Sequence, residues 1–167
     1  MKGAKMPVHN INPIYDAQSE ILILGSFPSV KSREGQFFYD HPQNRFWKVL
    51  AAVLGTSVPQ SHAEKSAFLR AHHIALWDVL AACEIQGSAD SSITAAKPND
   101  LAPILQAAKI KAVFCNGAAA FRYYDTYTFP KTGMEAVKLP STSPANAAFS
   151  LEKLCTEWQA ILRFLTP

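Results

Sequence analysis

The sequence predicts a three-layer α/β/α fold. Its middle layer is a central, mainly parallel four-stranded sheet, and helices form the layer on each side. Two observations predict it. Short, continuously apolar segments recur along the chain, as is typical of strands buried on both faces of a parallel sheet. Segments with apolar residues at helical spacing lie between them, and strands that alternate with helices place helices on both faces of the sheet.

The predicted strands are short. The first, residues 21–24, contains only Ile and Leu and is followed by Gly25. The last contains Lys138 and is less uniformly apolar, so we expect it at the edge of the sheet. In chain order the predicted strands are residues 21–24, 74–77, 112–115 and 136–139.

Three segments have an apolar stripe at helical spacing. Asn44 precedes the first segment and is expected to cap it, while Gly55 can end it. Asn99 is expected to open the second segment, and Ser150 is expected to cap the third. These predicted helices are residues 46–54, 101–108 and 151–165.

Length and composition predict one compact domain that spans residues 1–167. Hydrophobic residues make up 49% of the chain and charged residues 17%, which excludes an intrinsically disordered protein. No apolar run reaches the roughly 18 residues of a membrane span, and residues 1–10 lack the apolar stretch of a signal peptide. We therefore expect a soluble, intracellular protein of the cytoplasm.

The cysteines and the net charge restrict the chemistry further. Cys83, Cys115 and Cys155 are odd in number and lack the close pairing of zinc or iron–sulfur ligands. We therefore expect no disulfide, no metal and no cofactor. The net charge of +3 permits contact with nucleic acid without indicating it.

The loops after the predicted strands are the expected ligand site, because ligands of such sheets bind outside the carboxyl ends of the strands. The loop after the first strand reads Gly-Ser-Phe-Pro-Ser at residues 25–29, and Asp78 follows the second strand. Asn116 follows the third strand, and residues 140–146 follow the fourth.

Two of these loops show a family resemblance. Residues 25–29, followed by Tyr-Asp-His-Pro-Gln-Asn-Arg-Phe-Trp at residues 39–47, resemble the mismatch-specific branch of the uracil-DNA glycosylase superfamily. Pro-Ser-Thr-Ser at residues 140–143 resembles the second motif of that superfamily, and the likeness continues through residues 150–154. The resemblance implies one glycosylase-like domain that hydrolyses the N-glycosidic bond of a base flipped out of DNA.

Within the superfamily, the chain most resembles the hypoxanthine-DNA glycosylases. Its Gly-Ser-Phe-Pro-Ser loop, residues 76–80 and the segment from Gly87 to Ile93 indicate this branch. Phe27 stands where mismatch-specific relatives have the Asn that places the attacking water, and Leu139 stands where uracil enzymes have a His. The implied substrate is a deaminated base, hypoxanthine, with uracil or mismatched uracil as the alternative.

Asn44 and Asn116 are the expected catalytic residues. Asn44 is expected to position the attacking water or contact the leaving base, and Asn116 to recognise or polarise the base, although these roles can be exchanged. Tyr39 matches the stacking Phe of the relatives, and stacking on an aromatic ring is worth roughly 1–3 kcal/mol per base. His41 and Asp78 are candidate proton donors to a leaving purine. The expected base-binding residues are Ser26, Phe27, Tyr39, Asn44 and Asn116.

A second group of residues is expected to contact the DNA. Residues 143–146 resemble the wedge that holds the vacated base stack open, and Pro144 stiffens this loop. Hydroxyl and backbone donors nearby suit the phosphates. The expected DNA-binding residues are Ser29, Ser141, Thr142, Ser143, Pro144, Ala145 and Asn146. The implied partner is double-stranded DNA with a deaminated base, or single-stranded DNA, and the protein is expected to be a monomer.

Other interpretations of these residues stay open. Asn44 can be only a helix cap, and Asn116 can be only part of a turn. The fold can also serve a non-catalytic module that binds nucleic acid or a nucleotide. A small-molecule hydrolase with Ser26 or Ser141 as nucleophile lacks the usual Gly-x-Ser-x-Gly elbow. No Lys lies within the motifs, so a Schiff base with the sugar is not expected, although Lys31 is nearby in sequence.

Overall fold

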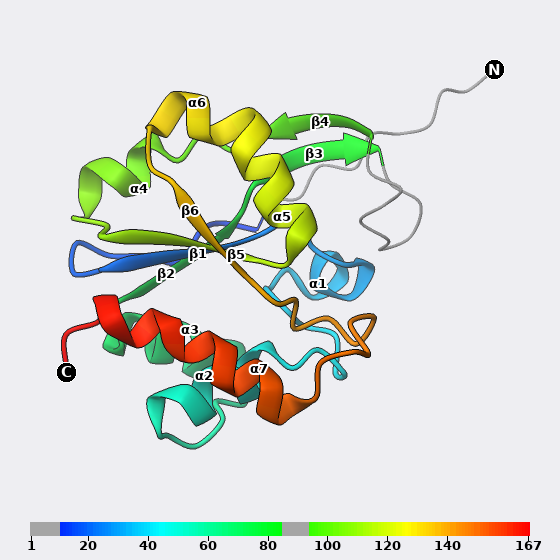
Figure 1. Ribbon diagram of the computed structural model, residues 1–167, viewed down its shortest axis with the longest axis vertical. Helices are drawn as coiled ribbons and strands as arrows, with labels where there is room; N and C mark the ends of the chain where they lie inside the picture. The colour runs from blue at the N-terminus through cyan, green and yellow to red at the C-terminus, as the bar shows by residue number, and fades with distance from the viewer. Residues whose placement is uncertain (1–10, 85–93) are drawn as a thin grey trace.

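The computed structural model describes residues 11–84 and 94–167, and its centre is a parallel sheet (Figure 1). The strands of this sheet are β1 (Ile21–Gly25), β2 (Ile74–Asp78), β5 (Ala112–Asn116) and β6 (Ala136–Leu139). They lie in the order β2-β1-β5-β6, and each is parallel to its neighbours. The predicted fold class is confirmed, each predicted strand is present, and β6 lies at an edge as expected.

Helices cover both faces of the sheet. Their bounds are α1 (Val30–Gly35), α2 (Phe46–Leu54), α3 (His62–Ala71), α4 (Ala102–Ala107), α5 (Ala118–Tyr123), α6 (Phe129–Thr132) and α7 (Leu151–Trp158). A π-helical segment, η2 (Tyr124–Thr128), joins α5 to α6, and a 3₁₀ segment, η3 (Gln159–Phe164), extends α7. Figure 1 shows α2, α3 and α7 on one side of the sheet and α4, α5 and α6 on the other.

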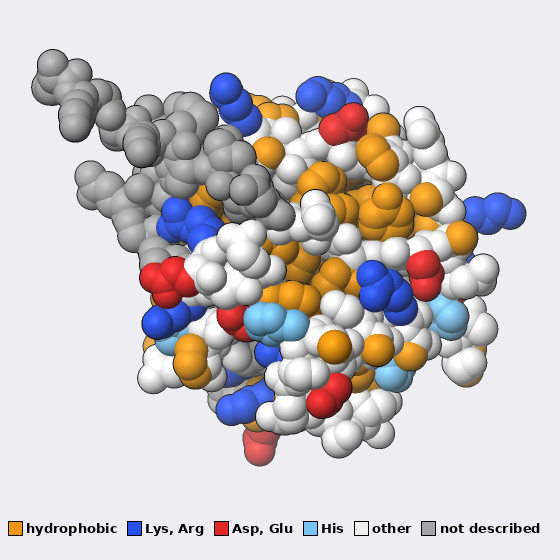
Figure 2. All heavy atoms as spheres, turned by 180° about the vertical axis from the view of Figure 1, so that it is seen from behind, with side chains coloured by type: hydrophobic (Ala, Val, Ile, Leu, Met, Phe, Trp, Pro, Cys, Tyr) orange, Lys and Arg blue, Asp and Glu red, His pale blue; other side chains and the backbone are white. Residues whose placement is uncertain are grey.

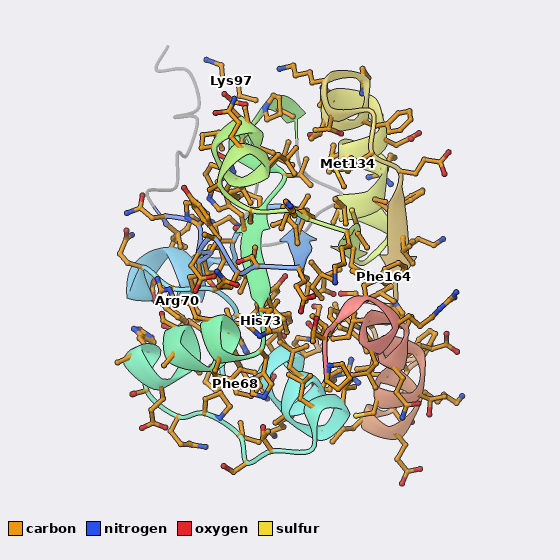
Figure 3. All side chains as sticks on the ribbon, turned by 90° about the vertical axis from the view of Figure 1, so that its left-hand side faces the viewer. Phe68, Arg70, His73, Lys97, Met134 and Phe164 are labelled. Carbon is orange, nitrogen blue, oxygen red and sulfur yellow. The ribbon has the colours of Figure 1, made fainter. Side chains whose placement is uncertain are left out.

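Alternate side chains of β1 divide the core into two layers. Ile21 and Ile23 pack with the cluster that includes residues of α2 and α7, whereas Leu22 and Leu24 pack with the cluster of α4 and α5. All four side chains are fully buried, as expected for a strand covered on both faces. Phe164 packs against the first cluster and Met134 against the second, and Figure 3 shows these two residues on opposite sides of the sheet.

The cap of α4 differs from the prediction. Asn99 does not cap the second predicted helix, because its Nδ2 donates to the carbonyl oxygen of Asp78 at 2.8 Å. Asp100 supports the start of α4 instead, since its Oδ1 accepts from the backbone N–H of Ala102 at 3.0 Å, while the N-cap position is Leu101. Asn99 therefore ties the loop before α4 to the carboxyl end of β2.

The last predicted helix is present but is not uniform. Ser150 caps α7 as predicted, because its Oγ accepts from the backbone N–H of Lys153 at 3.2 Å. The α-helix ends at Trp158 and continues as the tighter 3₁₀ segment η3, a common ending for α-helices. The apolar stripe thus predicted the extent of the helical segment but not its change in winding.

Several elements had no sequence prediction. They include α1, α3 and the α5-η2-α6 segment, together with an antiparallel pair of strands, β3 (Leu80–Glu84) and β4 (Thr94–Pro98). The segment from Gly87 to Ile93, which indicated the hypoxanthine branch, lies outside the described residues. Within residues 11–84 and 94–167, no helix is long and apolar enough to cross a membrane.

Glu20, just before β1, fastens two distant segments to the sheet. Its carboxylate accepts from Lys111 Nζ at 2.5 Å and from the Thr166 hydroxyl at 2.6 Å. The hydrogen bonds from Lys111 and Thr166 lower the pKa of Glu20 from 4.5 to about 2.

We expect Glu20→Gln to destabilise the protein at neutral pH and to lose this effect in acid. Because the folded-state pKa is depressed, the ionised carboxylate stabilises the fold above pH 4.5, and this contribution disappears as the pH falls through about 2. Urea unfolding of both proteins between pH 7 and pH 2 measures the difference. A difference in the free energy of unfolding that is constant over this range would contradict the prediction.

Candidate active site

A pocket of about 410 Å³ opens at the carboxyl end of the sheet, where the fold class predicts a ligand site. Every strand of the sheet sends its following loop or its last residue to this pocket. The lining residues are Gly25, Ser26, Phe27, Pro28, Ser29, Ser32, Phe38, Tyr39, His41, Asn44, Asp78, Asn116, Ser141, Thr142, Ser143, Pro144 and Ala145. All the predicted site residues except Asn146 are among them.

Asn44 is held at the start of α2 by two hydrogen bonds to its side-chain oxygen. Its Oδ1 accepts from the backbone N–H of Phe46 at 2.9 Å and from the hydroxyl of Thr142 at 2.8 Å. The first contact satisfies the backbone N–H of the first residue of α2, although the N-cap position is Arg45 and not Asn44 as predicted. The second connects it to a loop that follows β6, so one side chain both supports the start of α2 and lines the pocket.

Asn116, at the end of β5, is bound to the same threonine. Its Oδ1 accepts from the backbone N–H of Thr142 at 3.0 Å, and its Nδ2 donates to Thr142 Oγ1 at 3.0 Å. Thr142 belongs to the pocket wall, has no exposed surface and links the two asparagines. We call these three residues the Asn44–Thr142–Asn116 network.

Aromatic side chains form another part of the wall. Tyr39 has a φ of 51°, a left-handed backbone conformation that costs a non-glycine residue roughly 1–3 kcal/mol and is concentrated at functional sites. Its ring stacks on Phe46, with ring centres 4.0 Å apart and an angle of 19° between the planes. Phe27 and Phe38 also line the pocket and are largely buried.

Gly25 lies where the hydroxyl of Tyr39 and the carboxylate of Asp78 approach the backbone. A Cβ atom at this position would lie 2.5 Å from Asp78 Oδ1 and 2.9 Å from Tyr39 Oη. Asp78 is only 3% exposed and lines the pocket, so the absence of a side chain at residue 25 leaves room for two pocket groups.

We expect Gly25→Ala to lower the free energy of unfolding by about 1–3 kcal/mol, the usual cost of overpacking. The displaced Asp78 or Tyr39 should also slow turnover by about tenfold or more, since misplaced pocket groups cost roughly this much. Gly133→Ala is the control: it is strained by a φ of 69°, but its Cβ would meet nothing within 4 Å. Urea unfolding and single-turnover assays measure both effects. Equal activity in the two variants would contradict the prediction.

Arg45 fixes the loop that follows β6 and was not singled out from the sequence. Its guanidinium donates to the carbonyl oxygens of Ser143 at 2.8 Å, Asn146 at 3.1 Å and Phe149. Its backbone N–H donates to the carbonyl oxygen of Thr142 at 3.1 Å. The position of Arg45 next to Asn44 in the sequence was visible, but its partners depend on the path of a loop about a hundred residues later.

The wedge-like loop also stabilises itself. Asn146 does not line the pocket, and its Nδ2 donates to the carbonyl oxygen of Ser141 at 3.0 Å. Ser141 Oγ accepts from the backbone N–H of Ser143 at 3.1 Å. Pro144 and Ala145 are exposed at the tip of this loop. Asn146 therefore shapes the loop, whereas the tip is the part that another molecule can reach.

Thr142 and Ser29 are placed differently from the rest of the expected DNA-binding group. Thr142 is buried, and its hydroxyl contacts Asn44 and Asn116 rather than solvent. Ser29 caps α1, since its Oγ accepts from the backbone N–H of Ser32 at 3.2 Å. Ser141, by contrast, is partly exposed on the pocket wall.

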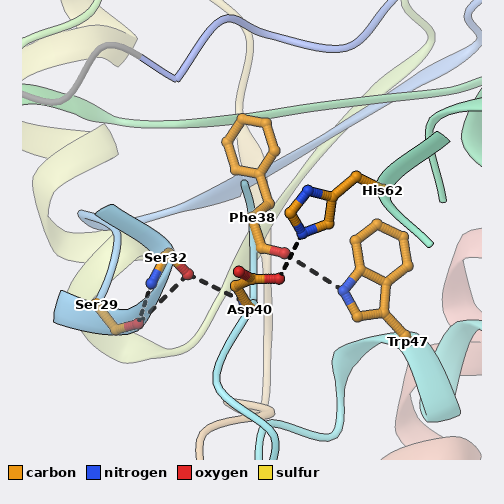
Figure 4. Close-up of polar contacts among 6 residues, drawn as sticks. All are labelled: Ser29, Ser32, Phe38, Asp40, Trp47 and His62. Atoms are coloured by element: carbon orange, nitrogen blue, oxygen red, sulfur yellow. Dashed lines mark hydrogen bonds and ion pairs between the residues drawn. The ribbon is translucent and has the colours of Figure 1, made fainter. Parts of the chain in front are cut away.

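A polar cluster behind the pocket supports the segment that contains Tyr39 (Figure 4). Ser32 Oγ accepts from the backbone N–H of Asp40 at 3.1 Å, and Asp40 Oδ1 contacts His62 Nε2 at 2.8 Å. The His62 ring stacks on Phe37 with ring centres 4.4 Å apart. The cluster therefore connects α1, the Tyr39 segment and the start of α3.

The histidines in the described part of the chain do not gather at the pocket. His41 lines it, and its Nδ1 accepts from the backbone N–H of Gln43 at 3.1 Å. His73 lies in the turn between α3 and the start of β2, at the end of this strand opposite to the pocket (Figure 3). The adjacent His72 contacts the carbonyl oxygen of Phe68 through Nδ1 at 2.9 Å.

The fold and the pocket together define an α/β/α protein with a pocket between asparagine amides and aromatic rings at the carboxyl end of its sheet. Comparison with protein families identifies it further. The model of the uracil DNA glycosylase superfamily matches residues 13–166. The chain belongs to this superfamily, as the sequence motifs predicted, and the predicted enzyme class, a DNA N-glycosylase, agrees with this membership.

The matches to individual relatives extend over most of both chains. It is 34% identical over 152 residues to a hypoxanthine DNA glycosylase of Methanosarcina acetivorans, covering 90% of this chain and 94% of the relative. It is 32% identical over 136 residues to a hypoxanthine DNA glycosylase of Methanosarcina barkeri, covering 80% and 85%. A solution NMR structure from M. acetivorans, described provisionally as a uracil DNA glycosylase, matches with a TM-score of 0.79 and 33% identity, covering 93% of this chain and 96% of that one.

Proposed function

We propose that this protein is a monofunctional DNA glycosylase that excises hypoxanthine from DNA by hydrolysis and leaves an abasic site. The observation that supports this most directly is the Asn44–Thr142–Asn116 network, which holds two amide side chains against a pocket of about 410 Å³. Pockets for small ligands have volumes of roughly 300–1,000 Å³, so this pocket is large enough for a flipped purine base. The relatives named hypoxanthine DNA glycosylase support the same substrate.

Binding in this proposal begins when the target nucleotide leaves the duplex. Flipping costs a few kcal/mol and costs least for a mismatched base. Stacking against Tyr39, whose ring is supported by Phe46, offsets part of this cost. The exposed tip at Pro144 and Ala145 is suited to occupy the vacated stack.

The asparagines act on the leaving base. Cleavage of the glycosidic bond places negative charge on the departing base, and fixed N–H donors stabilise that charge. Because Phe46 and Thr142 already donate to Asn44 Oδ1, the amino end of Asn44 serves the base, which favours the leaving-group role over water activation. The carboxylate among the pocket's lining residues is Asp78, and a carboxylate is suited to accept a hydrogen bond from the attacking water.

The side chains of the pocket support hydrolysis without strand cleavage. No lysine is among its lining residues in the described part of the chain, so none is placed to attack the sugar. Lys31 lies on α1 with an exposed side chain, and its Nζ is 3.7 Å from a carboxylate oxygen of Glu34.

Contact with the DNA backbone depends on fixed hydrogen-bond donors in this proposal. On the face that Figure 2 shows, Lys and Arg side chains lie among Asp and Glu and do not form one basic field. Ser141 and Ser143, with neighbouring backbone N–H groups, are suited to contact phosphates on either side of the flipped nucleotide. We propose double-stranded DNA with a deaminated base as the substrate and an intracellular monomer as the active form.

The direct test is base release from defined DNA. Purified protein is incubated with end-labelled duplexes that contain hypoxanthine, uracil, xanthine or no lesion, and alkali then reveals abasic sites. We expect release of hypoxanthine above uracil, with no strand cleavage before alkali. Release of uracil alone would overturn the substrate, and tight binding without release would indicate a non-catalytic binding module.

A further inference from the structure

The Asn44–Thr142–Asn116 network has a fixed hydrogen-bond polarity. A backbone N–H can only donate, so the atom of Asn44 that faces the N–H of Phe46 at 2.9 Å must be oxygen. The same reasoning identifies the atom of Asn116 that faces the N–H of Thr142 at 3.0 Å as oxygen. These two backbone donors therefore identify the oxygen atom of each amide.

The hydroxyl of Thr142 connects these two orientations. It accepts from Asn116 Nδ2 at 3.0 Å, and its single hydrogen is donated to Asn44 Oδ1 at 2.8 Å. Both acceptor sites of Asn44 Oδ1 are then occupied by protein donors. Thr142 has no exposed surface, so water does not compete for these bonds at its side chain.

Only donors are left for a ligand on this part of the wall. Among the described residues, neither hydrogen of Asn44 Nδ2 has a protein partner, and Asn116 Nδ2 has one hydrogen beyond its bond to Thr142. An oxo group on a base accepts from such donors, whereas an amino group would bring two donors together. Adenine has an amino group where hypoxanthine has an oxo group, and cytosine differs from uracil in the same way.

We propose that Thr142 is a positioning residue that determines specificity: its hydroxyl occupies the second acceptor site of Asn44 Oδ1 and holds Asn116 Nδ2 in place, so that both asparagines present donors to the base, and this selects deaminated oxo bases over their amino parents. This inference rests on the proposed function, since it concerns the base in the same pocket. It assigns the discrimination to a buried side chain that does not itself contact the base. The contact with the base is made by Asn44 and Asn116.

The test compares Thr142→Val, which has nearly the same shape without a hydroxyl, with Thr142→Ser, which keeps the hydroxyl. The probes are duplexes with 2′-fluoro-2′-deoxyinosine or 2′-fluoro-2′-deoxyadenosine opposite the same base, because the fluorine opposes the positive charge that cleavage builds on the sugar. We expect Thr142→Val to reduce the ratio of inosine to adenosine affinity by about tenfold, the size of one lost base contact. Thr142→Ser should keep the wild-type ratio within about threefold, as loss of a methyl group changes no polar contact.

A wild-type ratio in folded Thr142→Val would overturn the inference, as would a wild-type protein without preference for the inosine duplex. If Thr142→Val does not fold, Asn44→Asp provides the second test, because a carboxylate presents an acceptor in place of the Nδ2 donors. We expect Asn44→Asp to lower the same affinity ratio, and an unchanged ratio would overturn the inference. Failure of the proposed function is recognised separately, as the absence of hypoxanthine release by the wild-type protein on cleavable DNA.

Discussion

Asn44→Ala is expected to lower the single-turnover rate of hypoxanthine release by about 100- to 1,000-fold, the usual effect of removing one fixed donor to a developing anion. Its Nδ2 is the donor in question, and its Oδ1 is occupied by Phe46 and Thr142. DNA affinity should change much less, because the phosphate contacts belong to other residues. The variant should also lose about 1 kcal/mol of stability, because the backbone N–H of Phe46 at the start of α2 loses its acceptor.

The control for Asn44→Ala removes a helix cap away from the pocket. Ser61 Oγ accepts from the backbone N–H of Glu64 at 3.0 Å at the start of α3, so Ser61→Ala should cost a similar stability and leave base release unchanged. Rates are measured with enzyme in excess over labelled duplex, and circular dichroism checks the fold of each variant. If the two variants release hypoxanthine at the same rate, Asn44 only supports the start of α2.

The sequence predicted the place of this site better than its internal contacts. Parallel strands all end at the same edge of a sheet, so the loop after β1, Asn116 and residues 140–146 had to meet once the strands were identified from their apolar runs. Tyr39 and Asn44 were added by the family resemblance. The structure brings the loop after β1, Tyr39, Asn44, Asn116 and residues 141–145 to one pocket, while their roles stay predictions until base release is measured.

The contacts that a folded loop makes could not be predicted from the sequence. Thr142 lies in a run of hydroxyl residues, and nothing in the run indicates which hydroxyl is buried and which faces the pocket. The choice between Asn99 and Asp100 as the residue that binds the first N–H group of α4 was equally open, because both residue types accept such hydrogen bonds well. In the structure Asn99 contacts Asp78 instead, and that decides the choice. Such decisions depend on partners far away in the chain.

Arg45 extends this argument to the wedge-like loop, because its guanidinium holds the carbonyl oxygens of Ser143, Asn146 and Phe149 at once. We expect Arg45→Lys to lose most of these bonds, since a single ammonium group cannot reproduce the planar fork. Hydrogen bonds to charged groups contribute roughly 1.5–3 kcal/mol each, so the free energy of unfolding should fall by about 2 kcal/mol or more. Arg70→Lys, at an exposed position on α3, is the matched control.

The effect of Arg45→Lys on activity should depend on the form of the DNA. The backbone N–H of residue 45 still holds Thr142 at 3.1 Å, so the asparagines keep their orientation while residues 143–149 loosen. A wedge is needed to hold open a duplex but not a single strand, and we therefore expect a loss of about tenfold or more on duplex DNA and a smaller loss on single-stranded DNA. Single-turnover rates on both forms, with hydrogen exchange of residues 143–149, measure this. Equal losses on the two forms would mean that Arg45 supports the pocket itself rather than the wedge.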